Sequence, residues 1–263
     1  MKPLLISALA VLAAAAPVAA RSPEAASNLK SLKPLAASQP TMTAPVPSSE
    51  ALPDLARLAP DADPEVLALG LSAMQCAQAH GTGENADRLA VIDYSRSSLT
   101  PRLWVFDLAQ RKLLYKELVA HGQGSGGDLP DRFSNEDGTH ASSLGLFYTR
   151  DTYQGKNGYS LRMEGLDAGF NDAAMSRAIV MHGAPYVSAE AGRKMGRLGR
   201  SWGCPAVRAA MAKPIIDVMK DGQFVFSYYP QQAWLTRSTL AQCAMARLHG
   251  KPQANPDKAV ATR

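Results

Sequence analysis

The sequence predicts a mainly β fold, a sandwich or barrel, with helices at its periphery. Seven short apolar runs, rich in β-branched and aromatic residues, lie between residues 89 and 229. Segments rich in Gly, Ser, Asp and Pro separate these runs, as is typical of strands joined by turns in a mostly antiparallel sheet. Helical patterns are confined to three other segments, so we expect the helices to cover the sheet.

The first 20 residues have the pattern of a secretory signal peptide. Met1 and Lys2 precede an apolar run from Leu4 to Ala16, and small residues follow as far as Ala20. The run is too short to cross a bilayer core, which takes about 20 residues. No cysteine follows it directly, so we expect no lipid anchor. Cleavage near Ala20 would give an exported protein of the periplasm or cell envelope, without an integral membrane segment.

Residues 21–60 are rich in Ala, Pro and Ser, which indicates a flexible linker. A helix is predicted over 64–79, because Asp63 can cap it, a proline suits its first turn, and its apolar residues share one face. We expect one folded domain over 61–250, with its core at 84–230. The tail, 251–263, is expected to be disordered.

The strands follow in order from the end of this helix. They are predicted at 89–95, 102–108, 112–122, 144–149, 159–166, 178–183 and 223–229. Two further helices are predicted at 205–220 and 231–249, the first of them broken or kinked by Pro214.

Charge and cysteine content narrow the classes of function. The formal net charge of +5 is spread along the chain without a basic run, which argues against nucleic-acid binding. Three cysteines in an oxidising compartment leave at least one unpaired. Cys76 and Cys243 flank the region that holds the motifs, so we pair them provisionally and leave Cys204 free.

The stretch 179–208 holds the residues suited to catalysis. His182 ends an apolar strand, and Cys204 lies in a Ser-Trp-Gly-Cys turn farther on. A nucleophilic thiol needs a nearby base or positive field, and a glycine turn can expose the sulfur and direct backbone N–H groups into the site. From these residues alone, a structural cysteine and a structural histidine remain an equally good interpretation.

Several motifs in order resemble the YkuD-like branch of the murein L,D-transpeptidase catalytic-domain family, over roughly residues 84–230. The family has His-Gly or His-Ser at a strand end and Ser/Thr-His-Gly-Cys after a variable loop. Here 182-HG-183 and 201-SWGC-204 occupy those places. The segments that also resemble the family are 121-HGQGSG-126, 143-SLGLFYT-149, 162-RMEGLDAGFND-172 and 197-RLGRSWGCPA-206.

The resemblance implies a transferase of cell-wall biogenesis with an L,D-transpeptidase-like β-sandwich or barrel and no cofactor. Its Cys204 thiolate would attack a D-amino-acid link in a peptidoglycan stem peptide, with His182 as base and then acid. The carbonyl of Gly183 would orient the imidazole. Backbone N–H groups around Gly203 and Cys204 would bind the oxyanion, at about 3 kcal/mol per donor.

Two departures from the family pattern bear on the substrate. Trp202 stands where the family has its second His, and Ala206 stands where it has an Arg. Arg208 could bind a substrate carboxylate if it faced the cleft, and a solvated surface position is an equal alternative. Ser201, Trp202 and Arg200 are further candidates for substrate contact.

Two other histidines need an interpretation. His121 also ends an apolar strand before a glycine loop, so it could replace the missing family His, although a structural role agrees better with base rates. His140, in a polar loop, is expected to be exposed and incidental.

Other classes of function remain open at this stage. The histidines with Cys204 could bind zinc, but no CxxC pair or His-Glu-x-x-His helix supports a metal site. A non-catalytic wall-binding module is a further alternative. Within the enzyme class, the sequence does not separate a transpeptidase from a carboxypeptidase or cross-link hydrolase. We expect a monomer.

Overall fold

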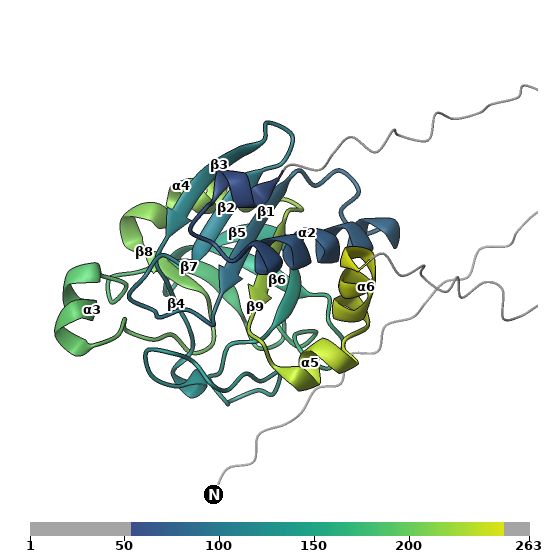
Figure 1. Cartoon of the computed structure of the whole chain (residues 1–263). Helices are drawn as coiled ribbons and strands as arrows, with labels where there is room; N and C mark the ends of the chain where they lie inside the picture. Colours follow the sequence, from purple (N-terminus) through teal and green to yellow (C-terminus); the bar gives the residue numbers. More distant parts are fainter. Residues whose placement is uncertain (1–53, 250–263) are drawn as a thin grey trace, which may run out of the picture. The chain divides into compact units, whose positions relative to one another are not determined.

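The computed structural model describes residues 54–249 of the chain (Figure 1). The predicted signal peptide, most of the linker and the C-terminal tail lie outside the described residues. Within 54–249, no helix has the length and apolarity that a membrane crossing requires.

Nine strands within residues 54–249 form one mixed sheet, which confirms the predicted mainly β class. In sheet order they are β3 (Lys112–Glu117), β2 (Leu103–Asp107), β1 (Arg88–Asp93), β9 (Phe224–Tyr228), β5 (Gly145–Gly155), β6 (Gly158–Gly165), β7 (Val180–Ala184), β8 (Ala206–Arg208) and β4 (Val119–Ala120). Two of the pairings, β1 with β9 and β7 with β8, are parallel. The other pairings are antiparallel, so the sheet is mostly antiparallel as predicted.

The sheet curls until its two edges meet. Strands β3 and β4 stand at opposite ends of the strand order, yet only Leu118 separates them in the chain. Glu117 and Val119 are two residue steps apart, which span at most about 7 Å, so the end of one edge lies within that distance of the start of the other. The run predicted as one strand over 112–122 is therefore two strands, because the chain leaves one edge and joins the other.

Helices cover this sheet. They are α1 (Leu55–Leu58), α2 (Pro64–Ala79), α3 (Ala189–Met195), α4 (Ala209–Met219), α5 (Gln232–Arg237) and α6 (Thr239–Leu248), with a 3-10 turn η1 (Gln123–Ser125). The prediction for 64–79 is confirmed, with Asp63 accepting a hydrogen bond from Glu65 N at 2.9 Å as N-cap.

Three expectations along the chain differ from the structure. The folded part starts before residue 61, because α1 buries Leu55 in the core. The predicted helix at 205–220 begins as strand β8, and α4 then continues through Pro214, since the helix buries Ile215 and Ile216 beside it. The predicted last helix divides into α5 and α6, because Ser238 caps the second helix by accepting from Ala241 N at 3.0 Å.

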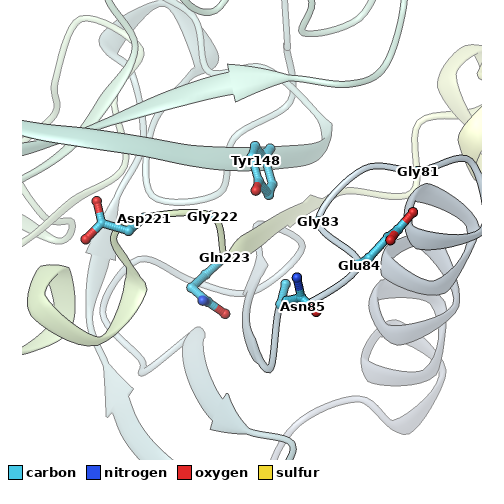
Figure 2. A pocket seen from close by; sticks show the side chains of 9 residues that line it. Gly81, Gly83, Glu84, Asn85, Tyr148, Asp221, Gly222 and Gln223 are labelled. Atoms are coloured by element: carbon cyan, nitrogen blue, oxygen red, sulfur yellow. The ribbon is translucent and has the colours of Figure 1, made fainter.

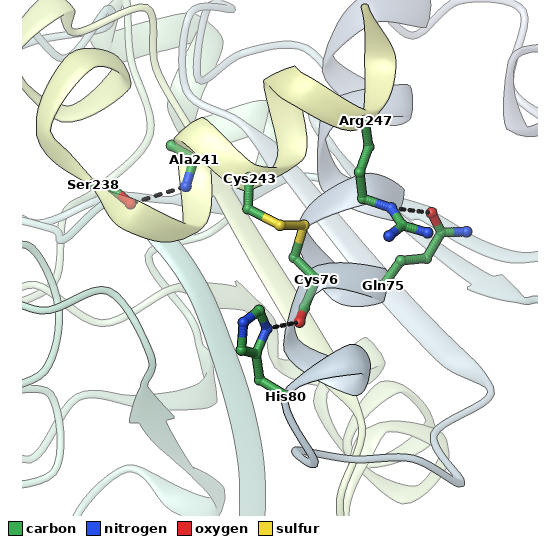
Figure 3. The surroundings of a disulfide bond; sticks show 7 residues. All are labelled: Gln75, Cys76, His80, Ser238, Ala241, Cys243 and Arg247. Carbon is green, nitrogen blue, oxygen red and sulfur yellow. Dashed lines mark hydrogen bonds between the residues drawn. A yellow bond between two sulfur atoms is a disulfide. The ribbon is translucent and has the colours of Figure 1, made fainter. Parts of the chain in front are cut away.

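A disulfide joins helix α6 to helix α2. Cys76 of α2 and Cys243 of α6 are bonded, with Cα atoms 6.2 Å apart (Figure 3). The two helices lie side by side against the sheet (Figure 1). Cys204 is the one free cysteine of residues 54–249.

Candidate active site

Cys204 lies in the turn that leads into β8, next to the end of β7. The parallel register places His182 opposite Ala206, two residues after the cysteine. The His182 N–H donates to the Pro205 carbonyl at 3.4 Å. Strand pairing therefore brings together two residues that 21 positions separate in the chain.

The shape of the turn is fixed by Ser201 and Gly203. The Ser201 hydroxyl donates to the Cys204 carbonyl at 2.6 Å and accepts from Gly203 N at 3.1 Å. Gly203 has a φ of +112°, and a Cβ there would come within 2.8 Å of the Ala141 carbonyl oxygen. Only glycine fits this position.

These contacts give both residues a structural role in the turn. The Ser201 hydroxyl is buried and shapes the turn, so it does not face substrate. The N–H of Gly203 is occupied by Ser201, so it is not a free oxyanion donor.

Two neighbouring loops hold the turn in place through hydrogen bonds. The Ser201 N–H donates to the His121 carbonyl at 3.0 Å, and Gln123 N–H donates to the Ser201 carbonyl at 2.8 Å. The Ser142 hydroxyl accepts from Gly122 N and donates to the Gly203 carbonyl, each at 3.0 Å. The glycine loop that follows His121 is therefore part of the scaffold of the cysteine turn.

The Cys204 sulfur is 3.4 Å from Val180 N and 3.7 Å from the Ala178 carbonyl oxygen. Burial raises the pKa of the thiol, and the Val180 N–H and the guanidinium of Arg177 oppose that rise. The residue is 8% exposed, so attack needs a substrate that reaches into the site. At neutral pH the resting group is a thiol that needs a base.

His182 is placed to act as such a base. Its Nδ1 is 2.9 Å from the Gly183 carbonyl oxygen, and because a carbonyl only accepts, Nδ1 carries the proton. Nε2 then keeps its lone pair. Burial lowers the pKa of the imidazole, against the effect of the Gly183 carbonyl, so the ring is neutral at pH 7. Among the described residues no hydrogen bond joins the ring to the sulfur, and such contacts often shorten only when substrate binds.

Residues 58–228 match the sequence pattern described as the L,D-transpeptidase catalytic domain. The chain belongs to this family. The membership confirms the resemblance in the sequence. No curated protein matches the sequence.

Solved structures that resemble the chain include three from bacteria. An L,D-transpeptidase from Mycobacterium smegmatis is 14% identical, with a TM-score of 0.35, over 55% of this chain and 59% of that one. One from Mycobacterium tuberculosis H37Rv is 16% identical, with a TM-score of 0.32, over 54% and 58%. The helical cell shape determining protein Pgp2 from Campylobacter jejuni is 12% identical, with a TM-score of 0.39, over 60% and 51%. The chain thus spans just over half the length of these proteins.

The two arginines predicted to bind substrate have other partners. The Arg208 guanidinium donates to both carboxylate oxygens of Glu117, at 2.7 and 2.6 Å. Glu117 is buried, so this two-point ion pair would be costly to break. Arg200 donates to the Gly126 carbonyl at 2.5 Å and ties down the glycine loop. The charge of Arg208 is therefore neutralised by Glu117, whereas Arg200 is bonded to neutral carbonyls only.

His121 does not replace the missing family His. It is 1% exposed, and its Nδ1 accepts from the buried guanidinium of Arg102 at 2.8 Å. Burial and the Arg102 charge lower the pKa of His121 to about 4. The Gly126 and Gly127 carbonyls lie near the ring, but Nε2 makes no hydrogen bond within the described part of the chain.

Trp202 and His140 form a stacked pair at the surface beside the turn. Their ring centroids are 4.7 Å apart with an angle of 8° between planes, and Trp202 is 71% exposed. His140 is half-buried, and Gln123 Nε2 donates to its Nδ1 at 3.0 Å. His140 is thus half-buried and not exposed as expected, because the loop folds back onto the cysteine turn.

Arg177 is a site residue that sequence analysis missed. It precedes Ala178, whose carbonyl contacts the Cys204 sulfur, and its guanidinium donates to the Ala141 carbonyl at 2.8 Å. Its sequence context, a polar stretch before a strand, resembles any solvated turn. Arg177 binds the loop 134–143, which is remote in sequence, so no local pattern indicates this contact.

Other parts of the described chain do not add to this site. No group of three or more His, Cys, Asp or Glu in residues 54–249 could hold a metal ion. A cavity of about 460 Å³ lies between the loop after α2 and the turn before β9 (Figure 2). None of the predicted site residues lines it.

Proposed function

We propose that the protein is an exported enzyme that transfers acyl groups on peptidoglycan stem peptides through a thioester at Cys204. Family membership supports the reaction class, and the position of the chain's free cysteine supports the nucleophile. The observation that carries the proposal is the tautomer of His182. The Gly183 carbonyl fixes the proton on Nδ1 and leaves Nε2 able to accept one, on the strand next to the cysteine turn.

In the proposed first step, His182 Nε2 takes the thiol proton as the sulfur attacks the substrate carbonyl carbon. The carbonyl electrons move to oxygen, and the Cys204 backbone N–H is the donor best placed to bind that oxyanion, since Gly203 N–H is occupied. The C–N bond then breaks, and the imidazolium returns the proton to the departing amine. A thioester and a free D-amino acid result.

In the second step an acceptor attacks the thioester, and His182 removes its proton. An amine acceptor gives a new cross-link or exchanged stem peptide, and water gives a carboxylic acid. In both cases the cysteine leaves as thiolate and regains its proton from the imidazolium. Mass spectrometry of products from defined muropeptides identifies the acceptor.

A carbapenem β-lactam, which the family resemblance suggests as a covalent label, tests the proposal. Intact mass should show one adduct on the wild type, mapped to Cys204, and none on Cys204→Ala. His182→Ala should form the adduct far more slowly, because the thiol loses its base. Adduct formation by His182→Ala at the wild-type rate would rule out the base, and modification at another residue would rule out the nucleophile.

A further inference from the structure

A small cavity of about 130 Å³ lies beside the cysteine turn. Its lining comprises Asp137, Gly138, His140, Arg177 and Trp202. Trp202 belongs to the turn itself, and the residue after Arg177 contacts the Cys204 sulfur through its carbonyl. The cavity is therefore adjacent to the group that would be acylated.

The guanidinium of Arg177 has a charge that no carboxylate neutralises by direct contact. Its Nη1 donates to the Ser134 carbonyl and the Ser143 hydroxyl, at 2.8 and 2.6 Å. Its Nη2 donates to the Ala141 carbonyl at 2.8 Å, with a weaker contact to Thr139 at 3.5 Å. All four acceptors are neutral oxygens, and within residues 54–249 Arg177 forms no ion pair and its Nε no hydrogen bond.

The other arginines near the turn cannot supply this charge. Arg208 is held by Glu117 through two hydrogen bonds. Arg200, like Arg177, is bonded only to neutral oxygens, but it does not line this cavity. Arg177 is thus the arginine that both lines a cavity at the turn and lacks an acidic partner in direct contact. It approaches the cysteine from the segment before β7, not from the residues after the cysteine.

An aromatic pair forms another part of the cavity lining. The Trp202 ring lies flat on His140, and Gln123 holds that imidazole through Nδ1. The stacked rings of Trp202 and His140 and the guanidinium of Arg177 line the same cavity. This combination suits a small group with one negative charge and a short aliphatic part.

We infer that this cavity binds the carboxylate of the departing D-amino acid, with Arg177 as its cation and Trp202 as its wall. The inference rests on the proposed function, because that reaction releases a D-amino acid from the C-terminal side of the attacked carbonyl. Binding there would hold the leaving amine near His182 and the scissile carbonyl near Cys204. The cavity volume suits a residue of the size of alanine.

Two matched substrates test the inference: a disaccharide stem peptide that ends in a free D-amino acid and the same compound with a C-terminal carboxamide. The full mature chain should form the Cys204 acyl-enzyme about 10- to 100-fold faster from the acid, the range of a charged hydrogen bond. Arg177→Gln should reduce that preference to near unity, mainly by slowing the reaction of the acid. Arg177→Lys should keep part of it, because the charge remains.

Two further variants serve as controls. Arg132 also donates to a loop carbonyl, that of Gly124, but does not line the cavity, so Arg132→Gln should keep the full preference. Asp137→Asn should increase the preference, because the acid competes with substrate for the Arg177 charge. This variant tests the cavity even if Arg177→Gln fails to fold.

The outcomes separate the subsite from the reaction. Equal loss on acid and amide in Arg177→Gln, or a lower preference in Asp137→Asn, would overturn the carboxylate subsite. A shift in the pH profile of iodoacetamide alkylation of Cys204, without change in the acid-to-amide ratio, would assign Arg177 to the thiolate instead. If the wild type is acylated by neither compound, the proposed function itself fails.

Discussion

Two strand ends in this protein carry the same dipeptide, His-Gly, and use it in different ways. His121-Gly122 follows β4, and His182-Gly183 lies in β7. Both histidines are buried and both have a lowered pKa. What separates them is the group bonded to Nδ1.

At His182 the partner of Nδ1 is a carbonyl, so Nε2 has a lone pair and can accept a proton. At His121 the partner is the guanidinium of Arg102, which only donates, so Nδ1 gives up its lone pair and Nε2 carries the hydrogen. The two rings are therefore opposite tautomers. One can act as a base, and the other is a neutral acceptor for a buried cation.

The largest expected difference between the two sites is in the rate of acylation. His182→Ala should slow formation of the Cys204 acyl-enzyme by about 10²- to 10⁴-fold, the range of general base catalysis. His121→Ala should slow the folded fraction less than about tenfold, since it transfers no proton. Intact mass against time gives both rates. Equal losses in two proteins with native circular dichroism would contradict the comparison.

Removal of the disulfide should affect the stability of the fold and leave the chemistry at both histidine sites unchanged. Cys76→Ser with Cys243→Ser should lower the free energy of unfolding by about 2–5 kcal/mol, because the open chain gains entropy. Neither α2 nor α6 contributes a residue to the two histidine sites, so the acylation rate of the folded variant should be unchanged. Urea unfolding and intact mass measure the two effects. A slower acylation at full folding would show that the disulfide acts on the site.

The buried His121 should make stability depend on pH. Its pKa falls from 6.5 to about 4 on folding, so the unfolded chain binds the proton more tightly. The free energy of unfolding should therefore fall as the pH is lowered from 6.5 to 4, by about 3 kcal/mol from this group. For His121→Gln, urea unfolding should show a free energy of unfolding that falls less between pH 6.5 and 4. Each protein is compared with its own value at pH 7.5. An unchanged slope would place the pH dependence elsewhere.

The smallest expected effects are those of substituting Gly122 and Gly183, the glycines that follow the two histidines. A Cβ at Gly122 would lie 2.2 Å from the His140 carbonyl and 2.7 Å from Gly203, whereas one at Gly183 would meet the Ala212 side chain of α4 at 2.8 Å. Both alanine variants should lose about 1–3 kcal/mol of stability by overpacking. Gly122→Ala should in addition slow acylation, because the clash displaces the cysteine turn. Equal acylation rates in Gly122→Ala and the wild type would show that the turn tolerates the shift.

The sequence was sufficient for most of the helices and strands and for the segment that forms the cysteine turn, because alternation, glycine turns and the Ser-Trp-Gly-Cys motif are local signals. It could not give the parallel pairing of β7 with β8, nor the jump from β3 to β4 across one residue. Those features depend on how a curled sheet closes, which no local pattern records.

The same limit explains the errors on individual site residues. Arg208 looked available because its partner Glu117 is remote in sequence, and the two meet only where the edges of the sheet come together. Ser201 and Gly203 looked available because the motif does not reveal that they bond to each other. Arg177 and His140 gave no signal because the segments that carry them reach the turn only through tertiary folding.

The strand order also has a consequence for how the molecule folds. Strand β1 pairs on one side with β2, its neighbour in the chain, and on the other with β9, in the register Leu89 opposite Phe224. The middle of the sheet is therefore completed by the last strand to be synthesised. Until β9 arrives, the β1–β3 meander has one edge open to solvent and the cysteine turn has no closed barrel behind it. Because contacts so distant in sequence form slowly, we expect folding on the millisecond-to-second scale, only after nearly the whole chain is available.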